Sequence, residues 1–182
     1  KMIKIMSVDD EPFFISDLSE AINRIGGDYQ FVCEAYDAQD ALKKITLNKP
    51  DIVFIDIKMP GVDGITLLRE VRKRYSYVIP IILSGYNNFS LVREALRAEA
   101  DDYLLKPIDQ DQLNALLKNK TDKVFSLRRK AQLELLYSCL NNTITDDNDI
   151  ATYFHHAWYF IFLINGNIFQ PDRDALTVIT GI

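Results

Sequence analysis

Five short apolar runs alternate with helical patterns in the first 117 residues, and this alternation is the feature that most constrains the fold. The runs cover residues 3–8, 29–34, 52–55, 79–83 and 103–105. The third run, Ile-Val-Phe-Ile, is apolar at every position, as in a strand that is buried on both faces. Five alternations of strand and helix predict a doubly wound α/β domain, in which helices cover both faces of a parallel sheet.

The sequence after residue 110 predicts further segments. Residues 112–140 contain neither Gly nor Pro and carry a loose apolar stripe, which predicts that the last helix continues as a linker. This linker either forms a short coiled coil or packs on its own chain. Residues 141–149 are polar and turn-rich, and residues 157–165 have a strong aromatic strand pattern. We predict an α/β domain over 1–118, a helical linker and polar turn region over 119–149, and the beginning of a second, incomplete domain over 150–182.

Composition and charge limit the kinds of binding partner that we expect for this chain. The chain carries a net charge of −5, and its basic residues are concentrated only in residues 118–130, whereas nucleic-acid binders carry a basic face over the folded domain. We therefore expect no DNA binding by this part of the chain. Cys33 and Cys139 have no metal-ligand spacing, which predicts reduced thiols and a cytoplasmic protein. The longest apolar stretches, 52–55 and 158–164, are far shorter than a membrane-spanning helix requires, so we expect no membrane partner.

Polar side chains follow four of the predicted strands, each at the strand's carboxyl end. Asp9 and Asp10 follow the first strand, Asp56 the third, Ser84 the fourth and Lys106 the fifth. In a doubly wound sheet the ligand site lies at this edge. Carboxylates on adjacent loops repel one another unless a cation joins them. Mg²⁺ is the expected cation, because it prefers oxygen ligands and keeps waters that a phosphate can replace.

The same residue types predict phosphoryl chemistry. A carboxylate beside Mg²⁺ can attack a phosphoryl group and hold it as an acyl phosphate. The ammonium of Lys106 would neutralise charge on the phosphoryl oxygens, and the hydroxyl of Ser84 would hydrogen-bond the group after its arrival. We predict that Asp56 is the nucleophile, because its strand has the most buried pattern.

Four motifs carry a family resemblance: Val-Asp-Asp-Glu-Pro at 8–12, Asp-Ile-Lys-Met-Pro-Gly-Val-Asp-Gly at 56–64, Ser-Gly-Tyr at 84–86 and Asp-Tyr-Leu-Leu-Lys-Pro at 102–107. Together they resemble the receiver domain of bacterial two-component response regulators, over about residues 2–118. The resemblance implies a flavodoxin-like fold with strand order 2-1-3-4-5. It also implies a signalling domain rather than an enzyme, one that accepts a phosphoryl group on Asp56 from a sensor histidine kinase.

The resemblance further assigns roles to individual residues. Mg²⁺ would be held by Asp10, Asp56 and the backbone carbonyl of Lys58, with Asp9 acting through water. Lys106 would pair with the phosphoryl oxygens, and its peptide bond to Pro107 would be cis. The switch residues would be Ser84, which moves toward the phosphoryl group, and Tyr103, which turns inward behind it. On phosphorylation, the family forms homodimers through the fourth helix, the fifth strand and the fifth helix.

The implied output is transcription control. The runs at 84–89 and 103–109 resemble receivers attached to AraC-family DNA-binding domains, so DNA would be bound only through an output domain outside this chain. Two residues depart from the commonest family pattern. Ser84 replaces the commoner Thr, which keeps the hydroxyl, and Glu99 stands where Gly is frequent. A left-handed turn at the end of a helix suits Gly better, so we expect this corner to differ in shape.

Four other functions can be compared with this one. Phosphatases of the haloacid-dehalogenase type carry a second Asp two residues after the nucleophile, where this chain has Lys58. A pseudo-receiver, which acts as an interaction module without phosphorylation, usually lacks an acid, the hydroxyl or the lysine, and all of these are present here. A receiver that controls an enzymatic output also stays open. Nucleotide binding is disfavoured, because the first strand ends in acids instead of a Gly-rich loop.

Overall fold

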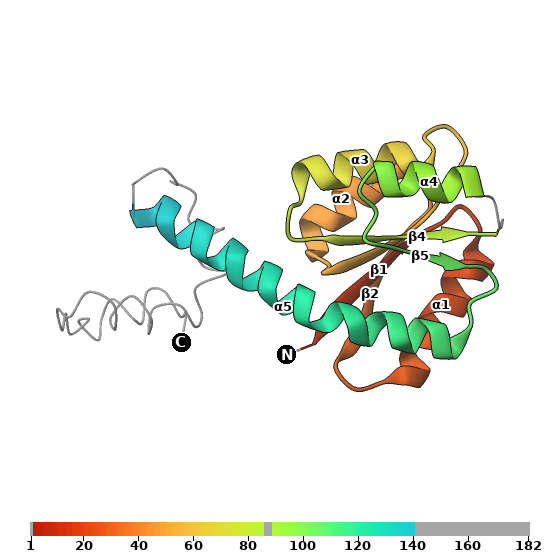
Figure 1. Ribbon diagram of the computed structural model, residues 1–182, viewed down its shortest axis with the longest axis horizontal. Coiled ribbons are helices and arrows are strands. Elements are labelled where there is room, and N and C mark those ends of the chain that lie inside the picture. The colour runs from red at the N-terminus through yellow and green to blue at the C-terminus, as the bar shows by residue number, and fades with distance from the viewer. Residues whose placement is uncertain (1, 86–88, 141–182) are drawn as a thin grey trace. The chain divides into compact units, whose positions relative to one another are not determined.

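The computed structural model describes residues 2–85 and 89–140 of the chain (Figure 1). The predictions for the polar turn region at 141–149 and for the second domain at 150–182 lie outside the described residues. The chain forms two compact units, Lys1–Arg128 and Arg129–Ile182. The first of these units contains all of the sheet.

The sheet has five strands, and its topology confirms the predicted fold class. The strands are β1 (Ile3–Val8), β2 (Tyr29–Ala35), β3 (Ile52–Asp56), β4 (Ile79–Ser84) and β5 (Asp102–Leu105). Their order is β2-β1-β3-β4-β5, and every neighbouring pair is parallel. All carboxyl ends of the strands therefore lie at one edge of the sheet, with β3 at its centre.

The helices are α1 (Pro12–Ile25), α2 (Ala38–Asn48), α3 (Gly64–Arg74), α4 (Phe89–Arg97) and α5 (Gln110–Leu140). Helices α2, α3 and α4 pack on one face of the sheet, and α1 and α5 on the other (Figure 1). Both faces are thus covered, as a doubly wound fold requires. Among residues 2–85 and 89–140, no helix combines the length and the apolar composition needed to cross a membrane.

Burial of the central strands follows from their sequence. All residues of β3 and β4 are buried, and Phe54 is among the largest side chains with no exposed surface. Burial of such a side chain contributes roughly 1.5–3 kcal/mol to folding. The apolar pattern of these two strands therefore places their last residues, Asp56 and Ser84, at the rim of the core.

Local sequence signals fix where the helices begin and end. Asp37 and Asp63 are N-caps whose carboxylates accept hydrogen bonds from the backbone N–H groups of Asp40 and Thr66, both at 2.8 Å. Such caps satisfy N–H groups that have no partner within the helix. After α4, Glu99 adopts φ +64°, the left-handed conformation expected for Gly at this corner. The corner keeps the left-handed turn despite the larger residue.

The compact α/β unit continues to Arg128, whereas the sequence analysis places the domain boundary at 118. Val124 is buried in the core cluster on the α1 and α5 face, and Thr121 Oγ1 lies 3.0 Å from Tyr29 Oη. Arg128 Nε donates a hydrogen bond of 2.5 Å to Asp51 Oδ1. The first residues of the predicted linker therefore belong to the domain, because the apolar stripe of α5 keeps facing the sheet.

Candidate functional site

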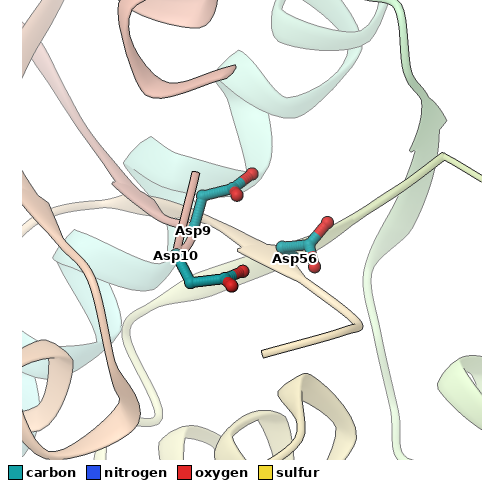
Figure 2. A group of neighbouring side chains, drawn as sticks. All are labelled: Asp9, Asp10 and Asp56. Carbon is teal, nitrogen blue, oxygen red and sulfur yellow. The ribbon is translucent and has the colours of Figure 1, made fainter. Parts of the chain in front are cut away.

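Three carboxylates converge at the carboxyl edge of the sheet. Asp9 and Asp10 follow β1, and Asp56 is the last residue of β3. Figure 2 shows the three side chains next to one another, with their carboxylates extending to the same side, and each offers a carboxylate oxygen within 4.8 Å of the others. Asp9 and Asp56 are buried, and Asp10 is half-buried. The structure thus brings together the acids that the sequence analysis singled out.

Backbone contacts hold these acids in place. Glu11 N–H donates to Asp9 Oδ1 at 3.0 Å, and Lys58 N–H donates to Asp56 Oδ2 at 2.7 Å. Gly64, the first residue of α3, packs so closely behind Asp56 that a Cβ there would lie 1.9 Å from the Asp56 carbonyl oxygen. The start of α3 and the end of β3 therefore require glycine at this position.

Lys106 is the cation of the site. Its Nζ lies 2.5 Å from Asp9 Oδ2 and 2.6 Å from Asp56 Oδ1, and its side chain is only 4% exposed. The backbone N–H of Lys106 donates to the Ser84 carbonyl at 2.8 Å, which joins the ends of β4 and β5. The Lys106–Pro107 peptide bond is cis.

The electrostatic balance of the site is negative, because three carboxylates face one ammonium. Burial raises the pKa of the Asp56 carboxyl above its ordinary value. The hydrogen bond and charge of Lys106 lower this pKa, and the charge of Asp9 raises it. The ionised form of Asp56 is therefore costly even with the ammonium of Lys106 beside it.

The donor set fits a hard divalent cation. Three carboxylate oxygens lie close enough to face one ion. Together with the ammonium of Lys106, the three carboxylates carry a net charge of −2 when all are ionised. Asp9 Oδ2 is buried and, among the described residues, accepts no hydrogen bond of good geometry, although it lies against Lys106. Oxygen ligands with excess negative charge are those that Mg²⁺ prefers. Asp9, Asp10 and Asp56 could therefore hold Mg²⁺.

The other predicted residues lie around this cluster. Ser84 is buried at the end of β4, beside Leu105 of β5 in the register of the sheet. Tyr103 is half-buried and packs against the core cluster on the α2, α3 and α4 face. The side chain of Lys58 is exposed. Tyr86, part of the quoted Ser-Gly-Tyr motif, lies outside the described residues.

A shallow depression of about 510 Å³ opens beside the cluster. Its lining includes Asp10, Lys58, Met59 and Glu94. The depression lies on the side of the half-buried Asp10 and the exposed Lys58. A ligand can reach the buried carboxylates from this side. A ligand that enters here first meets the loop after β3.

One residue of the site, Phe14, is not predicted from the sequence. The ring of Phe14 lies against Lys106, with 3.9 Å between its centroid and Nζ. The only available signal was the aromatic pair Phe13 and Phe14 in the first turn of a helix that follows three acids. Spacing alone does not tell which of the two rings turns inward.

Fold and site together define a doubly wound α/β domain with an acidic cluster at the carboxyl edge of its sheet, and comparison with known proteins identifies its family. The model of the response regulator receiver domain matches residues 5–118. The chain belongs to the response regulator receiver domain family. Members of this family are signalling domains of two-component systems.

Individual relatives support this assignment. The chain is 33% identical over 112 residues to an uncharacterized transcriptional regulatory protein, YesN, of Bacillus subtilis, covering 62% of this chain and 30% of that protein. It is 36% identical over 118 residues to the transcriptional regulatory protein HptR of Staphylococcus aureus, covering 64% and 45%. This chain therefore spans less than half the length of both relatives.

Solved structures agree on the fold. The receiver domain of AraT, a response regulator from Geobacillus stearothermophilus, superimposes with a TM-score of 0.58 at 31% identity, covering 74% of this chain and 99% of that one. A CheY-like receiver domain from Methanospirillum hungatei gives a TM-score of 0.61 at 25% identity, covering 69% and 98%. Nearly the whole length of each receiver is thus matched within this chain.

Proposed function

We propose that this chain is the receiver of a response regulator that accepts a phosphoryl group on Asp56 from a sensor histidine kinase. The observation that carries the proposal is the arrangement around Asp56, whose carboxylate contacts Lys106 at 2.6 Å and lies beside two further carboxylates. Asp56 stands at the end of the central, fully buried strand β3. A fixed carboxylate between a lysine and an acidic metal site is suited to phosphoryl acceptance.

In the proposed reaction a carboxylate oxygen of Asp56 attacks the phosphorus of a phosphohistidine. A new O–P bond forms, the P–N bond breaks, and the imidazole nitrogen leaves with the electron pair of that bond. Bound Mg²⁺ would be held by Asp10, Asp56 and the backbone carbonyl of Lys58, with Asp9 acting through water, and would supply positive charge to the phosphoryl oxygens. Lys106 adds its ammonium to the same oxygens.

The phosphoryl group would then act as a switch. It adds about two negative charges to the site, which the Ser84 hydroxyl would meet by moving toward it. Tyr103 would turn into the space behind Ser84. The changed surface of α4, β5 and α5 would favour a homodimer, a population shift between two states.

The output we propose is transcription control through a DNA-binding domain outside this chain, of the AraC type. The motif runs at 84–89 and 103–109 support this subtype, and the names of the relatives in Bacillus subtilis and Staphylococcus aureus support a transcriptional role. We place the protein in the cytoplasm, where such regulators meet their kinases and DNA.

Light scattering tests the proposal. The mass of the chain is measured with Mg²⁺ alone and with Mg²⁺ plus beryllofluoride, a mimic of the phosphoryl group, for the wild type and for Asp56→Asn. We expect a monomer that becomes a dimer with beryllofluoride only in the wild type. A mass that does not change removes the dimer switch for this chain. If Asp56 also binds no beryllofluoride, the chain is a pseudo-receiver that acts as an interaction module.

A further inference from the structure

Lys106 is enclosed by more than its two carboxylate partners. The ring of Phe14, in the first turn of α1, lies 3.9 Å from Nζ measured to the ring centroid. Asp9 and Asp56 contact the same Nζ at 2.5 and 2.6 Å. With 4% of its side chain exposed, the ammonium has exchanged most of its water for two carboxylates and one aromatic face.

We propose that Phe14 is a positioning residue for phosphoryl acceptance, which holds the ammonium of Lys106 against Asp56. This inference rests on the proposed function of Asp56. The face of an aromatic ring carries partial negative charge and attracts a cation, most strongly where water is excluded. Phe14 therefore stabilises the charged end of Lys106 on the side that has no carboxylate.

The need for such a residue follows from the side chain of lysine. Its ammonium is a strongly hydrated point charge on a flexible four-carbon stem. Without further contacts, rotamers that expose the ammonium to water are therefore favoured over the buried rotamer. The ring occupies the space beside Nζ and makes the buried position favourable. When the O–P bond to Asp56 forms, the ammonium then needs to move only from the carboxylate oxygens to the adjacent phosphoryl oxygens.

The neighbouring aromatic residue provides a matched control. Phe13 follows Pro12 in the same helical turn, but it is 73% exposed. Its ring meets Phe14 edge-on, with 5.6 Å between centroids and 72° between planes. Substitution of Phe13 therefore changes the apolar surface of the same turn without removing the ring that faces Lys106.

The main test compares Phe14→Leu with Phe13→Leu. Leucine keeps an apolar side chain but has no aromatic face. The maximal rate of Asp56 phosphorylation and the half-saturating donor concentration are measured with acetyl phosphate and Mg²⁺. We expect the maximal rate to fall about tenfold in Phe14→Leu, between the factors that an exposed and a fully desolvated cation–π contact are worth, because Phe14 is half-buried. In Phe13→Leu we expect a fall of less than twofold. Phe14→Tyr keeps the aromatic face and is expected to retain most of the rate.

A second readout needs neither metal nor phosphoryl donor. In the NMR spectrum, protons on Cε of Lys106 next to an aromatic face are shifted upfield by its ring current. We expect this shift in the wild type, Phe13→Leu and Phe14→Tyr, and its loss in Phe14→Leu. If Phe14→Leu does not fold, 3,4,5-trifluorophenylalanine at position 14 keeps the ring shape and weakens its negative face, and a reduced rate is again expected.

The outcomes separate the two proposals. If the wild type is phosphorylated and both Phe14→Leu and the fluorinated variant react at the wild-type rate, the role of Phe14 is wrong and the function of Asp56 stands. Equal losses in Phe13→Leu and Phe14→Leu also overturn it, because they indicate a general effect on the helical turn. A wild type that neither reacts with acetyl phosphate nor binds beryllofluoride overturns both proposals.

Discussion

Gly64 shows at the scale of one residue how closely the site is packed. A Cβ at this position would lie 1.9 Å from the carbonyl oxygen of Asp56 and 2.9 Å from Cα of Ile57. Both contacts are with backbone, which cannot move aside as a side chain can. We predict that Gly64→Ala lowers the free energy of unfolding by about 3 kcal/mol, at the upper end of the cost of overpacking.

Urea denaturation measures this loss, and beryllofluoride binding reports whether Asp56 is displaced as well. Gly85→Ala is the control, because a Cβ at Gly85 meets no heavy atom of the described residues within 4 Å. We expect a change of less than about 0.5 kcal/mol there. Equal stabilities of the two variants would show that α3 shifts freely behind Asp56.

The charge of Asp56 has a pH-dependent cost. Burial raises the pKa of Asp56 in the folded chain, so the metal-free fold is penalised wherever this carboxyl is ionised. We predict that Asp56→Asn raises the free energy of unfolding at pH 7 in the presence of EDTA. Near pH 3.5, just below the ordinary Asp pKa of about 3.9, the wild type is mostly protonated in both states and most of the advantage disappears. The advantage grows as the pH rises from the ordinary pKa toward the raised pKa of the folded state, and it levels off above that raised pKa.

Urea titrations between pH 3.5 and 8 check this expectation. Asp28→Asn, which removes the charge of an exposed residue, should show no comparable dependence on pH. An Asp56→Asn variant that is less stable than the wild type at pH 7 would mean that the pair with Lys106 outweighs the burial of the charge.

The sequence predicts the acidic cluster well, and physical reasons explain what it misses. In a parallel sheet the carboxyl ends of all strands share one edge, so Asp9, Asp56 and Lys106 meet once the strands are recognised. The contact of Phe14 with Lys106 depends on which of two adjacent rings turns inward. That choice is made by packing across 92 positions of sequence, between 14 and 106, which no local pattern contains. The roles of these residues in phosphorylation stay predictions.

At the scale of elements, the strands and helices follow from hydrophobic periodicity, but the end of the domain does not. The apolar stripe of α5 predicts a helix beyond 118 without showing what it packs against. Leu113, Leu117 and Val124 of this stripe are buried in the domain core. The pairing of Arg128 with Asp51 spans 77 positions, and neither residue carries a signal for its partner. Up to Arg128 the predicted linker therefore packs on its own chain.

The Arg128–Asp51 pair makes a testable contribution to stability. Arg128 also donates to the Met2 carbonyl at 2.7 Å, and Lys4 N–H donates to Asp51 Oδ2 at 2.7 Å. The side chains of Arg128 and Asp51 are 20% and 7% exposed. We predict that Arg128→Met lowers the free energy of unfolding by about 2 kcal/mol, below the range for fully buried pairs because water reaches the guanidinium in part.

Chemical denaturation of Arg128→Met, Asp51→Asn and the double variant measures the interaction free energy between Arg128 and Asp51. The double variant should lose less than the sum of the single losses, because each single change leaves one charge without its partner. Arg129→Met, at the exposed neighbouring position, should change stability by less than about 0.5 kcal/mol. Additive losses would show that the two residues act independently.

For the whole molecule, the acidic cluster predicts stabilisation by a divalent cation. A ligand that binds only the folded chain adds about 1.4 kcal/mol at ten times its Kd. We predict a saturable rise of the unfolding temperature with Mg²⁺, which Asp10→Asn weakens strongly. NaCl at equal ionic strength is the control for screening, and the same rise with NaCl would exclude a specific site.

Strand β3 carries a different contact at each end. Asp56 is its last residue, and Asp51, which holds α5 through Arg128, directly precedes its first. The proposed phosphoacceptor and the attachment of α5 thus lie at opposite edges of the sheet. For protein engineering, this places a natural fusion point immediately after Arg128. A chimera joined there keeps both ends of β3 intact and can exchange the downstream module, whereas a junction at 118 would cut away the helix that Asp51 holds.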